Sequence, residues 1–559
     1  MPLAIASQTD DAALKRRMAL AGSSGPLAAF QNLRVVGIAM FACLGGLLYG
    51  YNQGVFSGVL TMTAFGNHMG AYTTDSTKKG WLTSILELGA WFGTLYSGFL
   101  AEVLSRKYAI LINTAIFILG VIIQCTAVSS SGANSILAGR FITGMGVDNA
   151  ECAPPEIRGL LVSLQQFSIE FGILISFWID YGTNYIGGTG DSQSDAAWLI
   201  PLCLQLVPAV ILFAGMIFMP FSPRWLVHHD REDEAHRVIA MLHGGSGTSA
   251  AIDEVIELEF LEIKAQSMFE KRSTAEKFPH LQEQTPWNTF KLQFVAIGSL
   301  FKTMPMFRRV IVATVTMFFQ QWTGINAVLY YAPSIFGALG LSNNTTSLLA
   351  TGVVGIVMFL TTIPMMVYVD RIGRKPVLIA GAIAMGINHL IIAIIFAIEQ
   401  DQWPTHKAAG WAAIVMVWLF AGNFGWSWGP CAWIIVAEVW PLSARPYGIA
   451  LGASSNWMNN FIVGQVTPDM ITHMRYGTFI FFGVMTLVGA AFVWMFVPET
   501  KQLTLEEMDV IFGSQGVAAS DKERMEQIRL ELGLVDRASE ELQTAEVREE
   551  VKESEVKAE

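Results

Sequence analysis

Apolar runs of roughly 20 residues alternate with short polar segments along most of the chain. A run of this length can cross the hydrocarbon core of a bilayer as a helix. The full-length runs lie near 35–60, 80–102, 108–128, 159–182, 198–219, 309–336, 347–369, 376–398, 411–437, 446–470 and 476–497, with a shorter one at 135–147. The pattern predicts an all-α polytopic membrane protein.

The composition agrees with this prediction and narrows the class. The 559 residues are 52% hydrophobic and 14% charged, whereas soluble domains carry about 25% charged residues. The start is polar, and its first apolar run is too long for a signal-peptide core. The five cysteines show neither metal spacing nor a disulfide framework, so we expect them to be small packing residues.

The chain lacks the sequence marks of an enzyme. Its nine histidines and five cysteines form no nucleophile or metal constellation. No Gly-rich phosphate loop with a Lys is present, which argues against a nucleotide-driven pump. We therefore expect no enzyme activity, no cofactor, no metal site and no nucleic-acid partner.

Two blocks of six spans flank a polar insert. We expect a tail (1–34), an N-terminal bundle (35–219), a helical linker (220–308), a C-terminal bundle (309–497) and an acidic tail (498–559). The linker reads as amphipathic helices near Arg231–His243 and Ile252–Phe269. Beyond residue 518 we expect a surface helix or disorder.

Basic clusters predict the orientation. Lys15–Arg17 precede the first span, Arg106 and Lys107 follow the second, and Arg371, Arg374 and Lys375 follow the eighth. All lie on one side if the short run 135–147 also crosses, which places both termini in the cytoplasm. The two loop clusters also resemble each other, and such a repeat predicts two bundles that rock about a midplane site.

Three amides interrupt the apolar stretch 310–336: Gln320, Gln321 and Asn326. An unsatisfied amide in lipid costs several kcal/mol, so each needs a partner. A helix would bring the three to neighbouring sides, where neutral donors and acceptors suit a polyhydroxylated ligand. Amides that only join this helix to its neighbours are the alternative. Three together, followed by Tyr330 and Tyr331, favour a ligand site.

These residues also carry a family resemblance, which covers about residues 35–510. The matching motifs are Asp370-Arg-Ile-Gly-Arg-Lys375, Pro220-Phe-Ser-Pro-Arg-Trp-Leu226, Gln320 to Tyr331, Glu438 with Arg445, and Pro498-Glu-Thr-Lys501. In combination they resemble the sugar-porter family of the major facilitator superfamily, and most closely its fungal hexose-type members. The resemblance implies two six-helix bundles around a central sugar site.

The resemblance implies three sets of functional residues. Substrate binding would fall to Gln166, Gln320, Gln321, Asn326, Trp433, Asn456, Trp457 and Asn460, with amides for hydroxyls and indoles for sugar faces. Coupling or gating candidates are Asn52, Glu87, Arg140, Glu170, Tyr330 and Tyr331. A cytoplasmic latch would use Arg106, Glu151, Arg158, Asp370, Arg371, Arg374, Glu438 and Arg445. Packing or interfacial anchoring of the tryptophans, and positive-inside anchoring by the arginines, remain alternatives.

Several positions depart from the family pattern. Asn52 stands where proton-coupled members carry an Asp, and an amide cannot titrate, which favours facilitated diffusion. Glu87 and Glu170 lie within spans and keep proton coupling open. Met358 replaces an Asn and cannot donate to a hydroxyl. After Val147 about nine residues are missing, so the run 135–147 gives about 20 Å of helix against a core of about 30 Å.

The leading hypothesis is a plasma-membrane transporter of a hexose such as glucose, which works by alternating access and facilitated diffusion. Its partners would be the sugar and the lipid bilayer. One alternative is a proton-coupled symporter of a sugar, polyol or quinate-like solute, which would add protons as a partner. Another is a sugar sensor that does not transport. Asn343 and Asn344 begin overlapping glycosylation sequons, which the topology places outside the cell.

Overall fold

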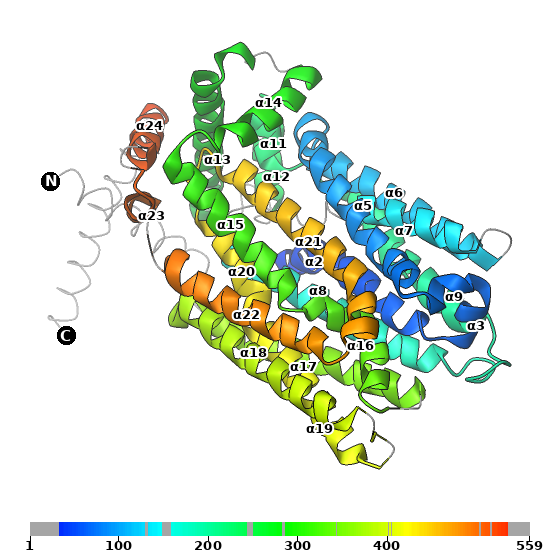
Figure 1. The fold of residues 1–559 in the computed structure, drawn as a ribbon. Coiled ribbons are helices and arrows are strands. Elements are labelled where there is room, and N and C mark those ends of the chain that lie inside the picture. The colour runs from blue at the N-terminus through cyan, green and yellow to red at the C-terminus, as the bar shows by residue number, and fades with distance from the viewer. Residues whose placement is uncertain are drawn as a thin grey trace, which may run out of the picture.

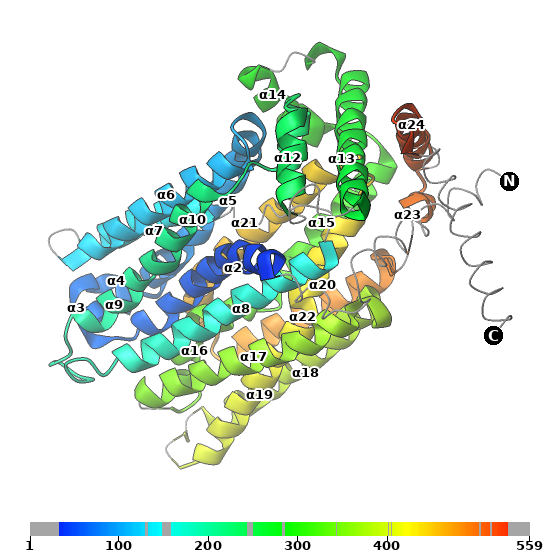
Figure 2. The ribbon, with the colours of Figure 1, turned by 180° about the vertical axis from the view of Figure 1, so that it is seen from behind.

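The computed structural model is helical and contains no strand in the residues that it describes. These are 33–128, 132–147, 158–242, 250–281, 285–341, 344–400, 402–403, 405–501, 503, 505–514 and 517–534. Helices run roughly side by side in two groups, with further helices at one end (Figures 1 and 2). The predicted all-α membrane fold is confirmed.

The first group is the N-terminal bundle. It consists of α2 (Leu33–Val59), α5 (Ser76–Val103), α6 (Arg106–Cys125), α7 (Ala133–Val147), α8 (Arg158–Thr183), α9 (Ala196–Leu204) and α10 (Leu206–Phe218). The short helices α3 (Thr63–Met69) and α4 (Ala71–Thr74) lead from α2 to α5, and the 3₁₀ turn η2 (Thr126–Val128) follows α6. The helix α7 is the truncated fourth span: its 15 residues give about 22 Å. Residues 148–157 lie outside the described residues.

The second group is the C-terminal bundle. It consists of α15 (Met304–Trp322), α16 (Ile325–Ala338), α17 (Asn344–Ile372), α18 (Arg374–Glu399), α19 (Lys407–Trp426), α20 (Trp428–Glu438), α21 (Arg445–Met474) and α22 (Gly477–Phe496). The bundles meet where α5 packs along α21 and α8 packs along α17.

Three predicted continuous spans are each broken into two helices. Gly324 separates α15 from α16 in the left-handed region (φ 90°, ψ 12°), which glycine adopts without steric cost. Gln205 separates α9 from α10, four residues after Pro201, whose ring disrupts the helical hydrogen bonds. Ser427 (φ −125°, ψ −86°) separates α19 from α20. Discontinuous helices are common near the central sites of transporters.

Linker and tail helices gather at one end, which we call the linker end (Figure 2). They are α11 (Pro223–His228), α12 (Glu232–Leu242), α13 (Ala250–Lys277), α14 (Pro286–Ser299), α23 (Leu505–Phe512) and α24 (Val517–Glu531). The tail is joined to the rest: Ile528 of α24 packs against Phe269 of α13. Asp509 of α23 forms a buried ion pair with Arg309 of α15, whose side chain is 1% exposed.

The helices divide into apolar and polar ones. Within the described residues, six helical segments are long and apolar enough to cross a membrane: Arg106–Val128, Ala196–Phe218, Thr346–Met365, Arg374–Glu399, Lys407–Glu438 and Gly477–Phe496. The helices α5, α15 and α21, which carry many of the candidate polar residues, are outside this set. Of these, α5 and α21 meet at the interface between the bundles, and α15 packs against α21 within the C-terminal bundle.

Glycines allow α2 and α8 to pack backbone to backbone. Gly46, Gly50, Gly54 and Gly58 recur every fourth residue of α2 and face α8. A Cβ atom on Gly50 would lie 1.8 Å from the carbonyl oxygen of Ile169. Close approach of this kind is typical of helix pairs in membranes, and it fixes the height of the polar residues of α2 relative to α8.

Candidate functional site

Five amide side chains form a continuous chain of hydrogen bonds at the centre of the protein. Gln53 donates to Asn326 at 2.8 Å, and Asn326 donates to Gln321 at 2.5 Å. Gln321 donates to Asn456 at 3.0 Å, and Asn456 donates to Gln320 at 2.5 Å. The last amide donates to two carbonyl oxygens at the start of α20, at 2.9 and 3.2 Å. None of the five is more than 4% exposed.

This amide chain crosses the bundle interface once. Gln53 belongs to α2 of the N-terminal bundle, and the other four belong to α15, α16 and α21 of the C-terminal bundle. The structure thus brings together four residues singled out from the sequence, although the break at Gly324, and not a continuous helix, sets the position of Asn326. A polyhydroxylated ligand could exchange amide–amide bonds for amide–hydroxyl bonds without a counter-ion.

A second link between the bundles centres on Tyr330 of α16. Its hydroxyl donates to the carboxylate of Glu87 on α5 at 2.6 Å and accepts from Gln53 at 3.3 Å. The same hydroxyl lies 3.0 Å from Oδ1 of Asn460 on α21. All four side chains are buried. The neighbouring Tyr331 makes a simpler contact, a hydrogen bond to the carbonyl of Gly464 at 2.7 Å.

Gln166 and Glu170 form a separate polar group on α8. Gln166 donates to Glu170 at 3.1 Å, and the hydroxyl of Thr362 on α17 donates to the other carboxylate oxygen. This bond again joins the two bundles. Met358, one turn earlier on α17, is buried. Glu170 and Thr362 therefore supply polarity next to the position where the family Asn is replaced.

Arg140 and Asn52 are buried with unused hydrogen-bonding capacity. Arg140 on α7 donates to the carbonyl of Thr83 at 3.0 Å and lies 3.9 Å from the ring centroid of Phe56. Its Nε and Nη1, both amide atoms of Asn52 and one carboxylate oxygen of Glu87 have no hydrogen-bond partner among the described residues. Asn52 is one turn from Phe56 on α2.

The two tryptophans differ in their surroundings. Trp457 of α21 is 1% exposed and packs edge-to-face on Tyr49 of α2, with 5.2 Å between ring centroids. In this conformation its ring is used for packing across the bundle interface. Trp433 of α20 is half-buried and packs against two hydrophobic clusters, each of which contains residues of both bundles.

Two of the predicted latch residues pair directly. Arg374 and Glu438 form an ion pair at 2.9 Å. The carboxylate of Glu499 accepts from the backbone N–H groups of Arg374 and Lys375 at 3.0 and 3.1 Å, which places a negative charge at the N-terminus of α18. Arg445 donates to a nearby carbonyl at 3.3 Å.

The other predicted latch residues are partly or fully exposed, or lie outside the described residues. Arg371 is exposed, and Arg106 is half-buried at the start of α6. Glu151 and the side chains of Arg158 and Asp370 lie outside the described residues. Of the sequon residues, Asn343 and the side chain of Asn344 also lie outside the described residues.

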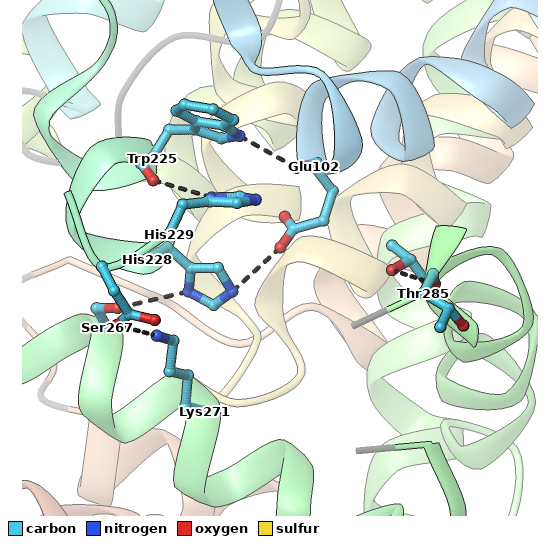
Figure 3. A network of polar contacts seen from close by, with 9 residues as sticks. Glu102, Trp225, His228, His229, Ser267, Lys271 and Thr285 are labelled. Atoms are coloured by element: carbon cyan, nitrogen blue, oxygen red, sulfur yellow. Dashed lines mark hydrogen bonds and ion pairs between the residues drawn. The ribbon is translucent and has the colours of Figure 1, made fainter. Parts of the chain in front are cut away.

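A polar network joins the N-terminal bundle to the linker (Figure 3). Glu102 at the end of α5 forms an ion pair with His228 of α11 at 3.3 Å, and its carbonyl accepts from Trp225 at 3.1 Å. Ser267 of α13 lies 3.4 Å from the other ring nitrogen of His228. Lys271 pairs with Asp230 at 2.9 Å.

The charges in this network shift one another's protonation. Burial lowers the pKa of His228, but the hydrogen bond and charge of Glu102 outweigh it, so the pKa lies above its ordinary value. Glu270 of α13 also faces the group, and burial raises its pKa. The docked linker thus favours a charged His228.

Polar contacts close the end opposite the linker. Lys79 of α5 donates to Ser334 of α16 at 2.9 Å. Asp469 of α21 accepts from Ser76 and Thr77 at the start of α5, and Gln465 donates to the carbonyl of Thr77 at 3.1 Å. Each bond joins one bundle to the other, so this end opens only when all of them break.

Sequence reasoning missed several of these residues. Gln53 carried the same signal as the three recognised amides, since it lies in an apolar run directly after Asn52. Thr362 had no such signal, because hydroxyls are common in membrane helices. Glu499 was part of a recognised motif, but its capping role depends on a helix start 125 residues away.

Buried amides between two six-span bundles, buried carboxylates and broken helices define a polytopic solute transporter of the major facilitator type. The chain matches the family described as "Sugar (and other) transporter" over residues 38–512. The protein belongs to this family, whose members are membrane transporters and not enzymes.

Curated relatives carry two kinds of name. The chain is 30% identical to a quinate permease of Neurospora africana over 523 residues, which covers 90% of this chain and 93% of the relative. It is 32% identical to the MFS glucose transporter mfs1 of Aspergillus flavus over 523 residues, which covers 88% and 93%. Both relatives are matched over nearly their whole length.

Solved structures show the same architecture. The proton:xylose symporter XylE bound to 6-bromo-6-deoxy-D-glucose superposes with a TM-score of 0.66 at 25% identity, covering 85% of this chain and 98% of that one. The inward-open xylose transporter XylE from E. coli gives 0.64 at 25% identity, with 85% and 99% coverage.

Proposed function

We propose that the protein transports a monosaccharide, a hexose such as glucose, across the plasma membrane by alternating access and facilitated diffusion. The observation that carries this proposal is the amide chain from Gln53 to Gln320, because its one link between bundles must break when they move apart. A sugar can then bind the released amides. Neutral donors and acceptors suit a neutral polyol better than an ion.

The orientation is part of the same proposal. Arg106, Lys107, Arg371, Arg374 and Lys375 all lie near helix ends at the linker end. Positive residues collect on the cytoplasmic side, so the linker and both termini would be cytoplasmic. The end closed by Lys79 and Asp469 would then face outward, and the sequons with it.

The proposal of facilitated diffusion, as opposed to proton coupling, rests on Asn52. It is fully buried, and its amide carries no proton that can move at physiological pH. Asn52→Asp would place a carboxylate there and should make uptake depend on a proton gradient. Loss of wild-type uptake on adding a protonophore would overturn the uniport proposal and direct attention to Glu87 and Glu170.

The decisive experiment is uptake of labelled hexoses into cells that lack their own sugar transporters. Gln53→Leu and Asn326→Leu should each raise KM or abolish uptake, because each removes an amide of the chain. Asn423→Leu, an amide of α19 outside the chain, is the matched control. A chain with a family-like fourth span restored between residues 148 and 149 runs beside the wild type. Equal uptake by the Leu variants and the control would contradict the proposed site.

A second candidate is a proton-coupled symporter of a quinate-like solute. It is supported by Arg140, whose buried Nε and Nη1 have no partner among the described residues, and by relatives named quinate permease. A guanidinium can bind a carboxylate in a bidentate manner. Uptake of labelled quinate with alkalinisation of the medium, lost in Arg140→Gln, would favour this candidate over a hexose uniporter.

A further inference from the structure

Two cysteines from different helices meet within the N-terminal bundle. Cys125 is the last residue of α6, and Cys203 lies one residue before the end of α9. Their sulfur atoms are 2.8 Å apart, although the residues are 78 positions apart in the chain. Both are free thiols and half-buried. Cys125 lies at the opposite end of α6 from Arg106, and so away from the linker end.

The pair lies beside two weak points of the bundle. The helix α9 contains Pro201 and ends at the break at Gln205, where the buried amide has no partner among the described residues. The hydroxyl of Tyr51 on α2 donates a hydrogen bond to the carbonyl of Pro201 at 2.9 Å. On its other side, α6 packs against the short helix α7. A covalent link between α6 and α9 would therefore brace the region where helices are broken or truncated.

We propose that Cys125 and Cys203 are a redox-modification site, which an external disulfide oxidant of the glutathione disulfide type converts into an intramolecular disulfide. One thiolate attacks the oxidant and forms a mixed disulfide, with release of one reduced thiol. The second thiolate displaces the other half. The products are the Cys125–Cys203 bond and two reduced thiols, which retain the two protons.

The pair lies near the end of the bundle opposite the linker. Cys125 is three residues from Val128, the last residue of the candidate span Arg106–Val128. The orientation under the proposed function puts this end outside the cell, where disulfides persist. Only the source of the oxidant rests on that orientation. The pairing itself depends on the contact between the two sulfur atoms.

The bridge would stabilise the bundle without blocking transport. Both helices belong to the N-terminal bundle, which moves as one body when the bundles rock. A bond inside one body leaves the relative motion free. Cross-linking α6 and α9 removes conformations from the unfolded chain and so raises stability.

The test uses the full chain in native membrane vesicles treated with glutathione disulfide. Free thiols are alkylated, the protein is digested without reduction, and peptides are identified by mass spectrometry. We expect a linked peptide pair that contains Cys125 and Cys203 and separates on reduction. The Cys43→Ser chain should give the same pair, whereas Cys125→Ser should lose it and leave Cys203 alkylated.

Thermal unfolding gives a second readout. The oxidised wild type and the Cys43→Ser chain should lose several degrees of Tm on reduction, whereas the Cys125→Ser/Cys203→Ser chain should show no change. Alkylation of both thiols after full oxidant treatment would overturn the proposal. So would a Tm that reduction leaves unchanged. Neither result bears on the transported solute, so failure here is distinguishable from failure of the proposed function.

Discussion

Removal of a single hydroxyl tests whether the link between Glu87 and Tyr330 holds the bundles together. Tyr330→Phe keeps the ring and its packing but deletes the oxygen that contacts Glu87, Gln53 and Asn460. The adjacent Tyr331→Phe is a matched control, because its hydroxyl bonds instead to the carbonyl of Gly464 and to the side chain of Thr83. Both side chains are 1% exposed, so burial does not distinguish the variants.

The buried groups that lose a partner set the size of the effect. A buried polar group left without a partner costs roughly 1–3 kcal/mol, whereas a typical neutral hydrogen bond contributes about 0.5–1.5 kcal/mol. Tyr330→Phe also leaves both oxygens of the Glu87 carboxylate without a partner among the described residues, since one lacks a partner already. We therefore expect a cost of about 2–4 kcal/mol, compared with about 1 kcal/mol for Tyr331→Phe.

The assay combines stability with transport. The Tm of purified Tyr330→Phe should fall at least twice as far as that of Tyr331→Phe. The lost bond spans the bundle interface, so the variant should also favour the state in which the bundles are parted, by roughly tenfold for each 1.4 kcal/mol. Its KM for uptake should change, while that of Tyr331→Phe stays near wild type. Equal Tm losses and an unchanged KM would refute this reasoning.

Three further predictions concern packing and charge. Gly50→Ala should lower Tm despite the helix propensity of Ala, because its Cβ would meet a backbone oxygen at 1.8 Å, whereas Gly182→Ala, with open space around it, should not. Wild-type Tm should rise as pH falls from 8 to about 6, since the raised pKa of His228 means that its stabilising charge is lost as pH rises, and His228→Gln should flatten this profile; a profile that stays unchanged would contradict it. Asp509→Asn should cost about 3–5 kcal/mol by leaving a buried cation unpaired, whereas Glu531→Gln, which removes an exposed partner, should lower Tm far less in the same thermal assay; equal losses would argue against a buried charge pair.

Much of the fold was predictable from apolar runs, because membrane helices need a fixed length of apolar sequence. The breaks within three of the predicted spans were harder to predict. Gly324 follows an amide-rich stretch and could have been recognised as a helix end. The break at Ser427 also had a signal, because Pro430 lacks the N–H that would bond the carbonyl of Trp426 in a continuous helix.

The amides of the site were predictable because polar groups in an apolar run need partners. Which partner each one takes was not, since Gln53 and Asn326 are 273 residues apart. The same holds for the cysteines, which were expected to be independent packing residues. Pairing of distant groups depends on the arrangement of helices, and one sequence does not contain that information.

The buried pair of Arg309 and Asp509 affects how the protein is made. Asp509 leaves the ribosome 200 residues after Arg309, or about 10–40 s later at about 5–20 residues per second. During that interval the arginine at the start of α15 has no counter-charge from the tail. The ion pair thus forms only after α23 has been synthesised. A chain cut short before α23 would carry all of its spans and still hold a buried arginine without its counter-charge, which we expect to lower its stability.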